Sequence, residues 1–212
     1  TRKRKSLDSG IARHIYVHSR LSIWVMTSSD HVAYREGSMD FYVPELFNHG
    51  LYYNTRPPMM IDDIFDCLER SKLICSKFYR HRISCLFWKN HPIERVCVVG
   101  LIVNHQWKEI LKTKEEFVLI TLDDCTSSKT KKPCFLVCKC SKELLISCGL
   151  QLNLSGNRVR VHGWMDFKYC EMQVEYLEIY NNIVLEIEHW KKASQLRQQM
   201  DVPWSIDQES LN

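Results

Sequence analysis

The stretch ERVCVVGLIVNHQW, residues 94–107, decides the fold. Its β-branched and apolar residues predict a long strand, and Gly100 interrupts that strand in the middle. Because a glycine has no Cβ to clash, it permits the sharp bend that the first strand of a small closed barrel needs. The turn Asn90-His91-Pro92 comes just before it, and we expect this turn to set the entry angle of the strand, since proline fixes its own φ.

The segments after this strand complete a small barrel. Alternating apolar residues predict further strands at 115–126, 134–140, 157–165 and 170–180. Residues 141–149 begin with a serine N-cap candidate and end in glycine, which predicts a short helix between the third and fourth strands. Five strands with one helix in that place indicate a mainly β protein, a five-stranded OB-fold Greek-key barrel.

The flanks of the barrel have patterns of their own. Residues 1–40 are polar and irregular, so we expect a flexible basic leader. Residues 41–93 form an N-terminal extension whose helix, predicted over 61–80, packs on the barrel of residues 94–180. A long C-terminal helix with its tail fills 181–212. The helix in the extension is predicted from apolar residues spaced by threes and fours, namely Ile61, Ile64, Phe65, Leu68 and Leu73.

Charge is distributed unevenly along the chain. The net charge is +4, and residues 1–20 carry six basic residues against one acidic residue. Residues 126–170 hold eight basic and two acidic residues, whereas residues 171–212 hold three basic and eight acidic residues. The middle of the chain could therefore attract a polyanion, although a charge run of this size also fits an ordinary solvated surface.

Neither a metal site nor an enzyme is expected. The ten cysteines are scattered without regular spacing, which is typical of buried free thiols in a reducing, intracellular protein. On one strand Cys134 and Cys138 would lie roughly 13 Å apart, too far to share a zinc ion with bonds of about 2.3 Å. Seven glycines provide no phosphate-binding loop or dinucleotide motif, so we expect no cofactor.

A nucleic-acid surface is the better candidate. If Val159 and Val161 point inward, the neighbouring basic and aromatic residues of the fourth strand point outward. The same alternation places Val118 and Ile120 inward and Phe117 outward on the second strand, and it places the cysteines of the third strand inward. Aromatic rings that stack on bases, interleaved with Lys and Arg on phosphates, hold single strands without reading their sequence. The alternative is that these rings merely pack beneath a loop or helix. The predicted contact residues are Phe135, Lys139, Arg158, Arg160, His162, Trp164, Phe167, Lys168 and Tyr169.

The C-terminal helix, predicted over 181–200, carries an apolar stripe that must be covered. It either folds back on its own barrel or pairs with a helix of a partner, and we favour the partner. The predicted partner-binding residues are Ile183, Val184, Ile187, Trp190, Ser194 and Arg197.

These motifs resemble a known family. NHPIERVCVVGLIV (90–103), LDDCT (122–126), RVHGW (160–164) and QVEYLEIY (173–180), followed by EIEHWKK and DVPWS, are similar to the N-terminal OB domain of the Stn subunits of CST, the trimeric telomere-capping complex, in its budding-yeast form. The resemblance runs from about Phe41 to Ser205. The middle subunit of replication protein A has a similar architecture.

The resemblance implies a non-catalytic nuclear protein of the chromosome end. It implies a heterodimer with the small Ten subunit, an assembly with the large subunit that binds single-stranded telomeric DNA, a limit on telomerase and contact with DNA polymerase α–primase. It places Lys139, Trp164 and Lys168 toward DNA, and Ile183, Ile187 and Trp190 at the centre of the pairing helix. Three other functions remain open: the middle subunit of a general single-strand-binding complex, a purely structural scaffold, or an appendage of a tRNA-handling enzyme.

Overall fold

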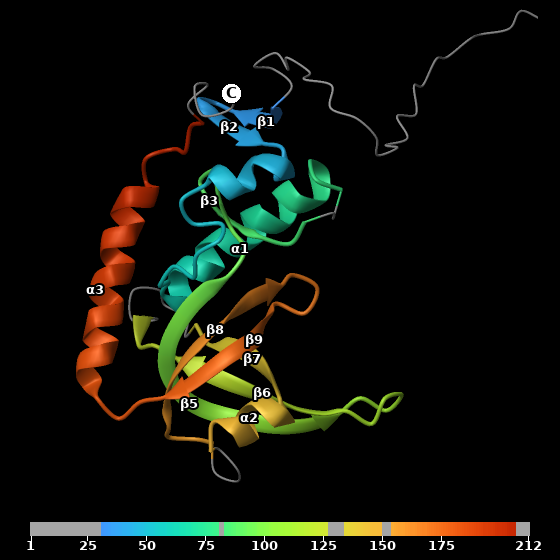
Figure 1. Ribbon diagram of the computed structural model, residues 1–212, viewed down its shortest axis with the longest axis vertical. Helices are drawn as coiled ribbons and strands as arrows, with labels where there is room; N and C mark the ends of the chain where they lie inside the picture. Colours follow the sequence, from blue (N-terminus) through green and yellow to red (C-terminus); the bar gives the residue numbers. More distant parts are fainter. Residues whose placement is uncertain (1–30, 81–82, 127–133, 150–153, 207–212) are drawn as a thin grey trace, which may run out of the picture.

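Five strands in the second half of the chain close into a barrel (Figure 1). The computed structural model describes residues 31–80, 83–126, 134–149 and 154–206. Around the barrel the strands follow the order β5-β6-β7-β9-β8, and β8 pairs with β5 to close the ring. The predicted OB-fold is confirmed, with α2 between the third and fourth strands. The elements are β5 (Val96–Glu109), β6 (Glu116–Asp123), β7 (Leu136–Ser141), α2 (Lys142–Ser147), β8 (Arg158–Asp166) and β9 (Glu171–Ile179).

Alternate side chains of each strand fill the barrel. This alternation was predicted for β6, β7 and β8, and it is what produces a single apolar interior from strands with a polar outer side. Cys134 was expected on the inner face of β7, but it precedes the strand and is only half-buried. The interior residues, each 0% exposed, are Val118, Ile120, Leu122, Leu136, Cys138, Cys140, Val159 and Val161.

Two glycines allow neighbouring backbones to approach closely. A Cβ on Gly100 would lie 2.9 Å from the carbonyl oxygen of Asp123, and a Cβ on Gly163 would lie 2.0 Å from that of Gln173. The β5–β6 register shifts between Ile102 and Asn104, just after Gly100. The sequence thus located the irregularity of β5, but the reason for glycine there is contact with β6 rather than the bend alone.

The extension before the barrel begins with a hairpin. The prediction of an irregular leader up to residue 40 is wrong for its last ten residues, because β1 and β2 pair as antiparallel strands. Residues 1–30 lie outside the described residues. The elements of the extension are β1 (Val32–Glu36), β2 (Met39–Tyr42), the 3-10 helix η1 (Pro44–His49), α1 (Ile61–Lys77), β3 (Leu86–Trp88) and β4 (His91–Ile93).

A second, aromatic core holds the extension together. Phe87 meets Phe41 and Phe47 edge-on at ring-centroid distances of 5.6 and 5.9 Å, and it stacks on Tyr79 at 5.8 Å. Such aromatic pairs add stability beyond the area they bury. Leu73 was expected on the buried stripe of α1 but is 61% exposed, because that side of the helix faces away from both cores.

Helix α1 is capped by the barrel. Its own N-cap residue, Met60, provides no side-chain bond. Instead the buried carboxylate of Asp124 accepts a hydrogen bond from the backbone N–H of Ile61 at 2.7 Å. The other oxygen of Asp124 accepts bonds from the backbone and hydroxyl of Thr126. The Asp-Asp turn therefore bonds its own backbone, as such turns commonly do, and also neutralises the free donors and positive dipole of a distant helix end.

Asn90, in the turn between β3 and β4, and His91, the first residue of β4, hold the C-terminal tail. The Asn90 side chain donates to the carbonyl of Trp204 at 2.7 Å and accepts from its N–H at 2.8 Å, as a neighbouring strand would. It also donates to the carbonyl of Asp40 at 2.9 Å. The His91 ring bonds the carbonyl of Val202 at 2.7 Å. A turn at Asn90-His91-Pro92 was expected to orient the first barrel strand. The turn instead lies one residue earlier, with His91 and Pro92 on β4, and its contact with the tail was not predicted.

Helix α3 (Ile183–Met200) runs from the end of β9 back past the barrel to this tail (Figure 1). One side of it is buried against the same chain through Glu186, His189, Ala193 and Met200. We expected this helix either to fold back on its own barrel or to pair with a partner, and we favoured the partner. It packs on its own domain along one side and leaves the other side exposed. No helix in the described part of the chain is long and apolar enough to cross a membrane.

Polar contacts fasten the buried side of α3. The His189 Nε2 atom bonds the carbonyl of Met59 at 3.2 Å. Arg197 forms an ion pair with the buried Asp63 at 3.0 Å, and Glu186 forms one with Arg158 at 3.4 Å. Burial lowers the pKa of His189 to about 4, so this histidine is neutral at pH 7.

Replacing Asn90 with alanine should destabilise the fold by about 2–4 kcal/mol, because three hydrogen bonds are lost and buried groups of Trp204 lose their partner. Urea unfolding measures this loss. Asn181→Ala, at an exposed position, is the control and should change stability by less than about 0.5 kcal/mol. Equal stability of both variants would contradict the role given to Asn90.

Acidification should weaken the docking of α3 through His189. Because its folded pKa lies below the ordinary value of 6.5, the unfolded chain takes up the proton first, and stability is lost as pH falls from 6.5 toward 4. Between pH 7 and 5 this contributes about 2 kcal/mol. In urea unfolding, His189→Gln should remove that part of the pH dependence. His49→Gln, on the surface, should retain it, and identical pH profiles for all three proteins would refute the prediction.

Candidate nucleic-acid and partner interfaces

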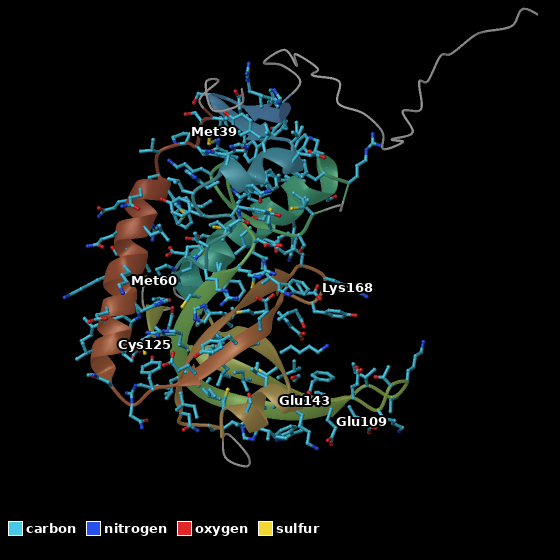
Figure 2. The ribbon with its side chains drawn as sticks, viewed as in Figure 1. Met39, Met60, Glu109, Cys125, Glu143 and Lys168 are labelled. Atoms are coloured by element: carbon cyan, nitrogen blue, oxygen red, sulfur yellow. The ribbon has the colours of Figure 1, made fainter. Side chains whose placement is uncertain are left out.

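The predicted nucleic-acid residues divide between two sides of the barrel. Figure 2 shows the loop of Lys168 and the hairpin tip of Glu109 projecting to one side, whereas α3 runs along the other. We call the first side the loop face and the second the helix face. Alternation assigns a side chain to the inside or the outside of a barrel, but the outside curves through a full circle. Outward-facing residues on different strands therefore need not share a surface.

Cross-strand pairing places Lys139 and Trp164 in one row on the loop face. Trp164 of β8 pairs with Gln173 of β9, and Gln173 pairs with Lys139 of β7. Paired residues point to the same side of a sheet, so these side chains are neighbours, with Trp164 and Lys139 about 10 Å apart. The row continues through Leu119 on β6 to Gln106 on β5. A row of this kind offers a ring, amides and a cation to an extended ligand.

Lys139 has an aromatic neighbour of its own. Its ammonium group lies 4.5 Å from the ring centroid of Phe117, which faces outward on β6. A cation over a ring leaves the charge available to a phosphate and holds the lysine in place. Phe117 was recognised as outward-facing from the sequence but was not among the predicted contact residues.

The loop between β8 and β9 borders the same face. Tyr169 is 59% exposed, and the Lys168 ammonium lies 4.8 Å from its ring. Contact with Tyr169 raises the pKa of Lys168, which therefore remains charged. Phe167 was predicted to contact nucleic acid, but its half-buried ring packs against both apolar cores. It supports the loop from below.

The β5–β6 hairpin extends the loop face beyond the barrel (Figure 1). Trp107 is 43% exposed on it and Leu111 is 81% exposed at its tip. Lys108 and Lys112 are also exposed, and Lys114 pairs with Glu109 at 3.3 Å. These residues were missed as contact candidates, although the basic pattern KEILKTK at 108–114 was a visible signal.

Arg158, Arg160 and His162 share the outer side of β8 with Trp164, as predicted, but they lie next to α3 on the helix face. Arg158 is paired with Glu186 of α3, and Arg160 with Glu178 of β9 at 3.2 Å. These acidic partners neutralise the charge that the prediction offered to phosphates. Arg160 and His162 line a cleft of about 240 Å³ beside α3. Burial, followed by the nearby cations Arg56 and Arg160, lowers the pKa of His162.

Phe135 is separate from both groups. It precedes β7 and is 42% exposed. It lies four residues before Lys139, roughly 13 Å along an extended chain. The structure therefore does not bring it to the row that contains Lys139 and Trp164.

The predicted partner-binding residues of α3 also divide. Ile183, Val184 and Ile187 are 48%, 49% and 41% exposed, and they make an apolar patch on the first turns of the helix. Ser194 is exposed further along, whereas Trp190 is half-buried. Arg197 contacts its own domain, since it pairs with Asp63 and lies 5.3 Å from the ring centroid of Trp88. Its role toward a partner stays a prediction.

Six of the ten cysteines are buried. In the described residues no three histidine, cysteine or acidic side chains are placed to hold a metal ion. Cys138 and Cys140 are both 0% exposed inside the barrel, and burial raises the pKa of Cys140 to about 12. These thiols are protonated at neutral pH and pack as small apolar groups.

Comparison with known proteins agrees with this architecture. A family model described as telomere regulation protein Stn1 matches residues 29–212. Protein STN1 of Saccharomyces cerevisiae is 38% identical over 189 residues, which cover 85% of this chain and 38% of the yeast protein. A chain from the crystal structure of yeast Stn1 and Ten1 has a TM-score of 0.75 at 28% identity, covering 86% of this chain and 96% of that one. A chain of the S. pombe Stn1–ten1 complex, at 21% identity, shares the fold with a TM-score of 0.50 and covers 68% and 92%.

Proposed function

The chain belongs to the Stn1 family of telomere regulation proteins, and on that basis we propose that it acts as a non-catalytic subunit of a telomere end-protection complex. It heterodimerises with a small Ten1-type OB-fold subunit and helps the assembled complex to bind single-stranded telomeric DNA. Relatives of the same fold are found in Stn1–Ten1 complexes of two yeasts, which supports a partner of that type.

The apolar patch on α3 is the observation that best supports the proposed heterodimer. Three aliphatic side chains, Ile183, Val184 and Ile187, are exposed to solvent on a helix whose other side packs on its own domain. Burying one such side chain fully is worth about 1.5–3 kcal/mol. The helix begins a few residues after β9 at one end and leads into the tail held by Asn90 at the other. It thus offers a partner a preformed surface at little cost in entropy.

The loop face supports the DNA contribution. It combines the cations Lys139 and Lys168 with the rings of Trp164 and Tyr169, and it lies away from α3 (Figure 2). A partner on α3 would therefore leave this face open. Rings and cations in alternation hold single strands largely through stacking and phosphate contacts.

The wider role of this chain depends on the complex in which it acts. The chain spans 38% of the length of the yeast protein that it matches. We infer association with a large subunit that binds telomeric single strands, a limit on telomerase, contact with DNA polymerase α–primase, and a nuclear location at the chromosome end. A general single-strand-binding complex and a purely structural scaffold are the competing functions. The salt-dependence experiment below separates DNA binding from a purely structural scaffold.

Ile187→Asp should abolish co-purification with the Ten1-type subunit after co-expression, because an aspartate would be buried without a counter-ion. Gln195→Asp, exposed two turns further along α3, places the same charge outside the apolar patch and should leave co-purification unchanged. Retention of the partner by Ile187→Asp, with the variant folded, would reject the patch as the docking site.

Lys139→Glu and Lys168→Glu should each weaken single-strand binding by the heterodimer and reduce the salt slope of log K by about 0.7, the value for one phosphate contact. Lys77→Glu, exposed at the end of α1 in the extension, makes the same charge change outside the barrel and should not alter the slope. Titration by fluorescence anisotropy at several salt concentrations measures both. Unchanged slopes in all three variants would favour the scaffold.

A further inference from the structure

A cleft of about 310 Å³ lies between the N-terminal extension and the barrel. Its lining includes the rings of Tyr53 and Trp164, the side chain of Ile83, and the charged residues Glu94 and Arg95. Its volume is at the lower end of the range in which proteins hold small ligands. Because Trp164 also belongs to the row that contains Lys139, the cleft adjoins the loop face.

The two rings make apolar walls. Tyr53 is held edge-on against Phe47, with ring centroids 5.4 Å apart, so its position is fixed by the aromatic core. Burial, and then the carboxylate of Glu94, raise the pKa of Tyr53, so the hydroxyl keeps its proton. Trp164 is half-buried on a barrel strand. Rigid aromatic walls of this kind bind flat groups by stacking.

The charged groups in and around the cleft balance one another. Arg95 pairs with Glu94 and, at 2.8 Å, with Glu175. Arg56 lies 3.9 Å from Glu175, which completes a network of two cations and two anions. A nearby phosphate would therefore meet no net negative charge. Within the described part of the chain, the Glu94 carboxylate accepts a hydrogen bond from Arg95 through its Oε2 atom. Its Oε1 atom can therefore accept further hydrogen bonds.

We propose that this cleft holds one nucleobase of the bound single strand and that Glu94 selects guanine. The proposal rests on the DNA-binding function proposed above. An ionised carboxylate only accepts hydrogen bonds, and guanine alone presents two adjacent donors, N1–H and N2–H, on its Watson–Crick edge. Adenine and cytosine place an acceptor beside their single amino group, and thymine flanks its N–H with two acceptors. In a single strand this edge is free to be read.

The test compares strands that differ by one amino group. The heterodimer is titrated with thymine oligonucleotides that carry a single guanine or, at the same position, hypoxanthine, which lacks the N2 amino group. The wild type should bind the guanine strand about tenfold more tightly. Glu94→Gln should abolish that preference, since an amide replaces one acceptor with a donor, whereas Trp164→Leu should weaken both strands alike.

A matched control separates recognition from folding. Glu178→Gln removes the partner of Arg160 on the helix face and lies outside the cleft lining, so it should retain the guanine preference, and thermal unfolding verifies that each variant is folded. Equal binding of both strands by the wild type, or an unchanged preference in Glu94→Gln, overturns this inference and leaves DNA binding standing. Failure to bind any strand overturns the proposed DNA-binding function and this inference with it.

Discussion

The pairing of Asn90 with the backbone of Trp204 is the constraint on which the arrangement of the surfaces depends. The amide of Asn90 pairs with Trp204 as a neighbouring strand would, and it also donates to the carbonyl of Asp40, so it holds the tail beside β2. Since α3 lies between β9 and that tail, the pairing fixes the far end of the helix. The side of α3 that meets solvent is thereby determined, and with it the patch of Ile183, Val184 and Ile187 that a partner can reach.

A closed barrel separates the two proposed activities in space. The helix face contains paired charges, such as Arg158 with Glu186, whereas Lys139 and Lys168 on the loop face lie beside aromatic rings that leave their charges accessible. The cleft beneath Trp164 extends the loop face onto the extension. Under the proposed function, one side serves a protein and the other a nucleic acid.

The sequence predicted what depends on local periodicity. Strand order, the inward position of Val118 and Ile120, and the boundaries of the long helix all follow from repeats of two or of 3.6 residues. What it could not predict depends on contacts between distant segments. Asp124 has the signature of an ordinary turn and nothing in its neighbours reveals that it caps α1. Arg160 was correctly assigned to the outside of the barrel, but only closure of the sheet shows that this outside lies beside α3.

Because the barrel lies between the loop face and the helix face, the two surfaces can evolve independently. An inward residue such as Ile120 contributes to neither surface, and an outward residue contributes to one side alone. Substitutions that adapt α3 to a changing partner therefore need no compensation among the residues that touch nucleic acid. During evolution, the specificity of one surface could change while that of the other was retained, because the apolar interior supports both surfaces and belongs to neither.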